Sequence, residues 1–165
     1  MAGTPRLSLP FLSVGQAQKE FTHNESLQTL DVLVGGSVEG VPLASPPSSP
    51  SLGAAYIVAS GATGAWAGKS PCVAAWTSGG WRFIFPPEGM TLYERGSGTW
   101  AVYRSGEWEF GNLRGAALLI DGLQVVGSRA AAIASPTGGT TIDTEARATL
   151  DAILGALRGH GLIDT

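Results

Sequence analysis

Two glutamates on one short segment have the spacing closest to a catalytic arrangement. Glu107 and Glu109 flank Trp108 in a stretch with the alternation of a β-strand. Alternate residues of a strand share a face, with Cα atoms roughly 7 Å apart, which overlaps the carboxylate separations of glycosidases. Any solvated strand with alternating acidic residues has this spacing, and few other candidate acids or bases surround the pair. We therefore expect that the protein is not an enzyme.

The two histidines are too isolated in the sequence to predict a metal site or a catalytic base. His23 lies in a polar stretch with Gln16, Lys19 and Asn24, and His160 lies in a terminal Gly-His-Gly. A zinc site needs three or four ligands, and neither histidine has such neighbours. We expect no metal and no cofactor. We expect instead that the polar stretch docks on a partner or a neighbouring subunit through Gln16, Lys19, His23 and Asn24, or that it caps the proline-rich connector that follows in the sequence.

The five tryptophans suggest a second kind of function, the binding of a saccharide, because a flat indole ring can stack on the apolar face of a sugar. Three of them lie at hairpin spacing, where aromatic side chains fill a core more often than they form a platform. These are Trp76, Trp81 and Trp108. Trp66, in a glycine-rich loop, and Trp100, at the start of a strand, are the candidates for exposure and for contact with a saccharide.

The elements that must position these tryptophans include one short aromatic unit that is written twice. Residues 74–83 and 101–110 share an Ala, an aromatic residue two positions later, Ser-Gly, and Trp-x-Phe. With Ser-Gly as the turn, each copy is a β-hairpin held by cross-strand pairs of large and small side chains. The predicted pairs are Trp76 with Trp81, Ala74 with Phe83, Tyr103 with Trp108, and Ala101 with Phe110. Gly79-Gly80 offers a competing register in the first copy.

Composition limits the classes of protein and partner. Of the 165 residues, 14% are charged, while 24 are Gly and 10 are Pro, which suits short strands joined by tight turns. The net charge is −3 and the sequence has no basic stripe, so we expect no nucleic-acid partner. We expect no membrane segment and no secretion signal. Cys72 is the only cysteine, which excludes an internal disulfide and favours a buried apolar role.

Helical patterns lie toward the two ends of the chain. Residues 1–10 are expected to be extended, with little to pack against, and residues 16–34 to form a helix that ends at Gly35-Gly36. Leu27, Leu30 and Val34 share one face of this helix. Residues 142–159 predict the clearest helix, with Asp143 as N-cap and Gly159 at its end. Its apolar stripe is formed by Ala146, Leu150, Ile153, Leu154 and Leu157.

Between the helices, a proline-rich connector over residues 40–50 precedes a series of strand-like pieces. The pieces cover residues 54–59, 72–76, 81–85, 91–94, 99–104 and 107–110, with more ambiguous apolar pieces at 118–126 and 130–134. We therefore predict a mainly β fold with flanking helices, the β part being a small antiparallel sandwich or barrel. The predicted parts are an N-terminal arm and docking helix over 1–37, a β domain over 38–134, and a C-terminal amphipathic helix over 135–165.

Several motifs occur in an order that resembles a known family. They are Leu9-Pro10-Phe11, QAQKE at 16–20, THNE at 22–25, GATGAWAG at 61–68 and GGWRF at 79–83. Together they resemble an uncharacterised family encoded among the structural genes of bacterial prophages and gene transfer agents. The resemblance covers roughly residues 9–93, and residues 145–163 are similar to the C-terminal helix of many members.

The resemblance implies a virion structural protein near a host-adhesion fibre, because members of the family occur among tail-fibre and head-spike components. In gene transfer agents, one such protein is associated with the head spikes that grip capsular polysaccharide. We expect the base or anchor of a head spike or tail fibre, assembled in the bacterial cytoplasm. The expected partners are three or five copies of the chain, capsid or tail proteins, and the fibre protein. The alternative is a carbohydrate-binding module that contacts the polysaccharide itself.

The C-terminal stripe is the second expected docking surface, formed by Leu150, Ile153, Leu154 and Leu157. A helix of about four turns is marginal alone and needs a partner surface. That partner is either the chain's own β domain or the same helix of another subunit. The low charge content also favours a surface that is partly covered by other chains.

Overall fold

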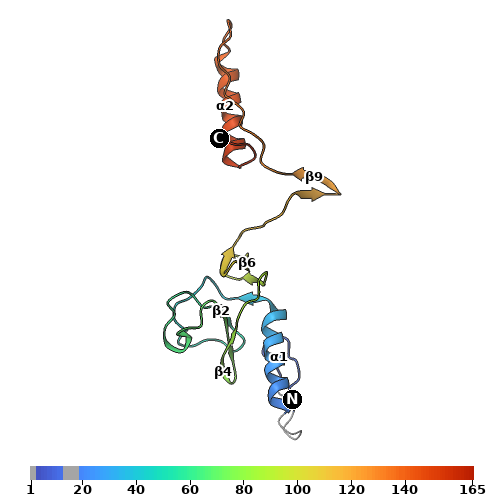
Figure 1. Cartoon of the computed structure of the whole chain (residues 1–165), viewed down its shortest axis with the longest axis vertical. Helices are drawn as coiled ribbons and strands as arrows, with labels where there is room; N and C mark the ends of the chain where they lie inside the picture. Colours follow the sequence, from blue (N-terminus) through green and yellow to red (C-terminus); the bar gives the residue numbers. More distant parts are fainter. Residues whose placement is uncertain (1–2, 13–18) are drawn as a thin grey trace. The chain divides into compact units, whose positions relative to one another are not determined.

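The computed structural model describes residues 3–12 and 19–165, and the chain divides into two compact units between Asn112 and Leu113 (Figure 1). Over the described residues, the N-terminal unit contains one α-helix and seven strands, and the C-terminal unit contains one hairpin and one α-helix. The strands within 118–126 pair with each other, and the predicted division at residue 134 stays a prediction.

Helix α1 (Lys19–Gly35) ends at the predicted glycines, and Gly36 has the positive φ of 47° that follows many helix ends. Its predicted start at residue 16 lies outside the described residues. The apolar face expected from Leu30 and Val34 is not the buried one, because these side chains are 48% and 70% exposed. The helix instead buries Asp31 and Val32.

Asp31 is buried because the first residues of the chain satisfy its carboxylate. Thr4 donates its hydroxyl to Oδ1 at 2.7 Å, the Leu7 amide donates to Oδ1 at 2.6 Å, and the Arg6 amide donates to Oδ2 at 2.9 Å. A buried charge is tolerated when hydrogen bonds replace its water. The prediction that residues 1–10 have little to pack against is therefore wrong for the described part of this segment. The prediction considered apolar side chains, whereas the segment is held by polar groups.

Arg6 extends this polar anchor to the start of the β-sheets. Its Nε donates to the Gly53 carbonyl at 2.7 Å and its Nη2 donates to the Ser37 carbonyl at 2.9 Å. The side chain lies against Gly35, so its positive charge is next to the negative end of α1, whose last turn has no basic residue. One residue thus connects the N-terminal segment, the end of α1, the first strand and the turn that precedes the second strand.

The seven strands of the N-terminal unit form two sheets that are not closed into a barrel. The first sheet has the order β1 (Ser37–Val38), β5 (Thr91–Glu94), β6 (Thr99–Arg104) and β7 (Glu107–Phe110). In this sheet β1 is parallel to β5 and the other pairs are antiparallel. The second sheet is antiparallel, with the order β2 (Ala55–Ile57), β3 (Val73–Thr77) and β4 (Gly80–Ile84). The predicted mainly β fold with flanking helices is confirmed.

The duplicated aromatic unit forms two hairpins in the predicted register. Trp76 pairs with Trp81 and Ala74 with Phe83, and the second hairpin pairs Tyr103 with Trp108 and Ala101 with Phe110. The two turns differ. Ser105 and Gly106 both have positive φ, 52° and 88°, whereas in the first hairpin the positive φ, 95°, falls on Gly80, the first residue of β4. The same pairing is therefore reached through two turn geometries.

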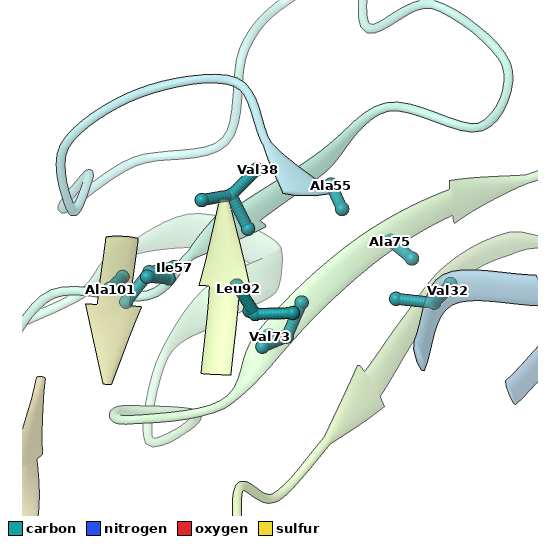
Figure 2. Packing of buried hydrophobic residues seen from close by; sticks show 8 residues of the cluster. All are labelled: Val32, Val38, Ala55, Ile57, Val73, Ala75, Leu92 and Ala101. Atoms are coloured by element: carbon teal, nitrogen blue, oxygen red, sulfur yellow. The ribbon is translucent and has the colours of Figure 1, made fainter. Parts of the chain in front are cut away.

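The apolar core lies between the two sheets and is closed by α1 (Figure 2). Val38, Leu92 and Ala101 contribute from the four-stranded sheet, and Val32 contributes from the helix. The three-stranded sheet contributes Ala55, Ile57, Val73 and Ala75. In β3, Val73 and Ala75 face this core while Ala74 faces a second apolar cluster, which follows from the two-residue period of a strand.

The C-terminal unit contains the hairpin of β8 (Leu118–Ile120) and β9 (Leu123–Val126), followed by α2 (Thr144–Gly159). Asp121 and Gly122 form the turn with positive φ values of 50° and 77°, so the predicted apolar piece 118–126 is two strands. The α2 prediction is confirmed: Asp143 accepts the Ala146 amide at 2.8 Å. Residues 130–134 form one bridge, between Ala130 and Ile163, rather than a strand.

We predict that Asp31→Asn destabilises the N-terminal unit by about 1–3 kcal/mol, because the amide nitrogen of asparagine cannot accept a hydrogen bond from a buried donor. Urea unfolding followed by tryptophan fluorescence measures the change. A loss below about 0.5 kcal/mol would contradict the anchoring role of the Asp31 carboxylate.

The matched control is Glu25→Gln, which makes the same chemical change in an exposed ion pair. Glu25 binds Arg82 at 2.7 Å, and that hydrogen bond holds the pKa of Glu25 below its usual value. A lowered pKa stabilises the fold above the unfolded-state pKa, and this contribution disappears as the pH falls through the folded-state pKa. The control should cost less than about 1 kcal/mol at neutral pH and nothing in acid.

Candidate functional site

The outer face of the three-stranded sheet carries a cluster of four aromatic rings. Trp81 lies at its centre, with ring centroids 5.0 Å from Trp66, 4.9 Å from Trp76 and 6.0 Å from Tyr56. Trp76 and Trp81 come from the predicted hairpin, and Tyr56 comes from β2. The rings meet at tilted or edge-to-face angles, which are favourable for aromatic pairs.

Trp66 is fully buried in this cluster, so the prediction that its ring is exposed is wrong. It ends a short 3₁₀ helix over Gly64–Trp66, and the loop folds the indole onto the sheet beside Val58 and Ala74. The small Ala74 side chain leaves room for the ring. A glycine-rich context predicted a loop correctly, but it gave no information on the direction of the indole.

Trp100 is half-exposed, as predicted, on the outer face of the four-stranded sheet. Its cross-strand partner is Tyr93, which is 39% exposed, and the two ring centroids lie 5.5 Å apart at an angle of 73°. Sequence analysis missed Tyr93. The short loop at 95–98 could have predicted its position. This loop places Thr91–Glu94 opposite Thr99–Arg104, and therefore Tyr93 opposite Trp100. The pair forms an accessible aromatic surface.

The two glutamates of β7 have different surroundings. Glu109 forms an ion pair with Arg104, whose Nη1 lies 3.2 Å from the carboxylate Oε2. Glu107 lines a cavity of about 410 Å³ together with Trp108, Pro42 and Pro71. The Trp108 indole donates to the Pro71 carbonyl at 2.9 Å, which fixes one wall of this cavity. The proposal that the chain is not an enzyme stays a prediction.

Glu94 is a buried carboxylate with a structural role. It accepts the amides of Gly96 at 2.5 Å and Ser97 at 2.9 Å, and it also accepts the Ser97 hydroxyl. The hydrogen bond from the Ser97 hydroxyl makes the largest contribution to lowering the pKa of Glu94, and the two backbone amides lower it further. The carboxylate therefore closes the turn between β5 and β6 as an anion.

The predicted N-terminal docking residues are only partly described. Gln16 lies outside the described residues, and Lys19 is the first residue of α1. His23 is exposed, and Asn24 pairs with the backbone of Leu12, accepting its amide at 3.0 Å and donating to its carbonyl at 3.3 Å. Asn24 thus holds the chain's own N-terminal segment against α1. A partner contact through the other three residues stays a prediction.

The predicted C-terminal docking stripe is divided between the interior and the surface. Leu154 is buried within the C-terminal unit and Leu157 is half-buried. Leu150 and Ile153 are about half exposed, at 48% and 51%. The stripe therefore keeps two apolar side chains available for a partner.

A cavity of about 550 Å³ in the N-terminal unit is lined in part by Arg6, Glu39 and Arg95, whose side chains bind other groups of the same chain. Arg95 binds Glu39 at 2.9 Å, and Arg6 holds two carbonyls. Burial, followed by the Glu39 charge, raises the pKa of Tyr56, which also lines this cavity. Across residues 3–12 and 19–165, no three metal-ligating side chains are grouped together.

No described helix is both long enough and apolar enough to cross a membrane.

Comparison with known families gives one match. A family model described as a protein of unknown function, DUF2793, matches residues 23–109, which extend from the first turns of α1 to β7. The match covers more than half of the chain, so the protein belongs to this family. No curated protein sequence matches the chain. The family region lies within the N-terminal unit, and the C-terminal unit lies outside it.

We predict that Trp66 and Trp100 differ strongly in their contribution to stability. Trp66→Ala should cost about 3–5 kcal/mol because it removes a fully buried ring. Trp100→Ala should cost about 1 kcal/mol or less, the scale of one exposed aromatic pair. Urea unfolding followed by circular dichroism compares the two variants. Similar losses would contradict the assignment of Trp66 to the core and Trp100 to the surface.

A second variant of the buried residue separates packing from polarity. The Trp66 indole nitrogen is buried without an acceptor among the described residues. Trp66→Phe keeps an aromatic ring and removes that unsatisfied donor, so it should cost less than Trp66→Ala.

Proposed function

We propose that this protein is a structural component of a phage-like particle, as the base or anchor of a head spike or tail fibre used in host attachment. The observation that carries the proposal is the difference between its two units. The N-terminal unit closes its own core between two sheets, whereas the C-terminal unit exposes most of its large apolar side chains. Such surfaces mark contacts with other proteins.

The resemblance of the N-terminal motifs to prophage and gene-transfer-agent structural genes supports the particle context. In this role the DUF2793 unit is a rigid module, and the C-terminal unit attaches it to its neighbours. The half-exposed Leu150 and Ile153 of α2 are contact residues in that attachment. The partners are other copies of the chain, three or five in number, with capsid or tail proteins and the fibre. Assembly takes place in the bacterial cytoplasm.

Particles purified from the producing bacterium test this proposal. We predict that mass spectrometry finds the chain in the particles, and that deletion of its gene gives particles that lose most of their adsorption to recipient cells. Absence of the chain from purified particles, or normal adsorption without it, would contradict the proposal.

Complementation of the deletion adds a matched pair of variants on α2. Leu150→Asp/Ile153→Asp places charges on the half-exposed apolar stripe, and Thr149→Asp/Ala152→Asp places them on exposed positions outside that stripe. The first variant should be missing from particles, and the second should be incorporated.

A second candidate function is direct binding of capsular polysaccharide. It is favoured by the exposed pair of Trp100 and Tyr93, because an accessible indole ring can stack on the apolar face of a sugar. The ion pair of Arg104 on β6 and Glu109 on β7 supplies polar groups on the same sheet for hydrogen bonds to sugar hydroxyls.

Calorimetric titration with purified capsular polysaccharide tests this second function. We predict that Trp100→Ala weakens binding at least about tenfold, which corresponds to about 1.4 kcal/mol. The control is Phe85→Ala, which removes another exposed aromatic ring, 66% exposed, from a different position. Absence of heat at millimolar sugar for the unmodified protein, or equal effects of both variants, would rule out this site.

A further inference from the structure

The β8–β9 ribbon, residues 118–126, presents apolar side chains on both of its faces. Leu118, Leu119 and Ile120 are consecutive, so they alternate between the two faces, and each is more than half exposed. β9 adds three further exposed apolar side chains, those of Leu123, Val125 and Val126. Strands that are apolar on both faces are typical of a sheet covered on both sides. The described remainder of the C-terminal unit does not provide such a cover.

The remainder of the C-terminal unit does not supply a core for the ribbon. In residues 113–165 the buried large apolar side chains are Leu154 and Ile163. An isolated two-stranded hairpin is at best marginally stable in water, and so is an isolated helix of the length of α2, 16 residues. The unit therefore needs apolar surface from outside itself to hold this structure.

We propose that a second copy of the same chain covers the ribbon, and that the C-terminal unit is stable only in that assembly. A unit without its own core requires a partner that is always available. A second copy of the chain meets this requirement, because it is present whenever the chain is synthesised. The charges also permit it. Between residues 113 and 142 the charged residues are Arg114, Asp121 and Arg129, and the ribbon carries a charge only at its turn, on Asp121. Two ribbons can therefore meet without like charges inside the strands.

The exposed apolar area of the C-terminal unit as a whole approaches that of a specific interface. At about 30 Å² per methylene, a four-carbon side chain has about 120 Å² of apolar surface. Twelve large apolar side chains of the C-terminal unit are exposed, most of them by about half. They offer on the order of 700 Å² per chain, close to the roughly 800 Å² per partner of a standard specific interface. The ribbon contributes six of the twelve.

This inference does not depend on the particle role. A chain that associates through the ribbon need not belong to a particle, and a particle component can associate through other surfaces. The solution mass of the purified protein tests the inference, whereas the composition and adsorption of particles test the proposed function.

Light scattering of the full-length protein is the experiment. Leu119→Asp/Ile120→Asp places one charge on each face of the ribbon, at positions that are 57% and 56% exposed. The matched control Val41→Asp/Leu52→Asp adds the same charge at N-terminal positions that are 63% and 59% exposed. We expect a discrete oligomer for the unmodified protein and the control. The ribbon variant should have the mass of one chain, 16.9 kDa.

Tryptophan fluorescence verifies that each variant keeps its N-terminal fold, because all five tryptophans precede residue 113. The ribbon variant should keep the native emission spectrum while its mass falls. A monomeric unmodified protein would overturn the inference, and so would a ribbon variant that keeps the oligomeric mass. A monomeric control, or loss of native fluorescence in the ribbon variant, would also overturn it, because the interface would then not be specific to the ribbon.

Discussion

The close approach of two small sheets determines the rest of the N-terminal unit. Ala55, Ala75 and Ala101 lie in the layer between the sheets, each at most 1% exposed, and their small side chains let Val38 and Leu92 reach the opposite sheet. Large side chains are consequently displaced to other positions: Trp66 and Trp81 pack on the outer face of one sheet, and Trp100 lies on the outer face of the other. Both the buried aromatic cluster and the exposed aromatic pair follow from this packing.

A polar anchor completes the same unit and determines which face of α1 is inside. The Asp31 carboxylate collects donors from the N-terminal segment, and Arg6 of that segment binds carbonyls of Gly53 and Ser37. The helix therefore turns a charged residue inward and leaves Leu30 and Val34 exposed. Helix packing in this protein is dictated by hydrogen-bond satisfaction as much as by apolar burial.

Local patterns in the sequence predicted the elements well and their burial less well. The Ser-Gly turns fixed both hairpin registers, and Asp143 fixed the start of α2, because turns and caps depend on neighbouring residues. The burial of Trp66 depends on Ala74 and Val58, which come from other segments, and the inward face of α1 depends on Thr4 and Arg6. These contacts between distant segments have no local signal. The pairing of Tyr93 with Trp100, by contrast, could have been predicted from the register of their hairpin.

The C-terminal unit differs from the N-terminal unit, because its regular elements do not enclose a core of their own. The central claim is that other copies of the chain supply that core. Amide hydrogen exchange of residues 118–126 across a dilution series tests this claim most directly, with residues 91–110 of the N-terminal unit as the internal reference. We predict that protection of the ribbon is lost on dilution while the reference stays protected. Protection of the ribbon that does not change with concentration, or is absent at every concentration, would contradict the claim.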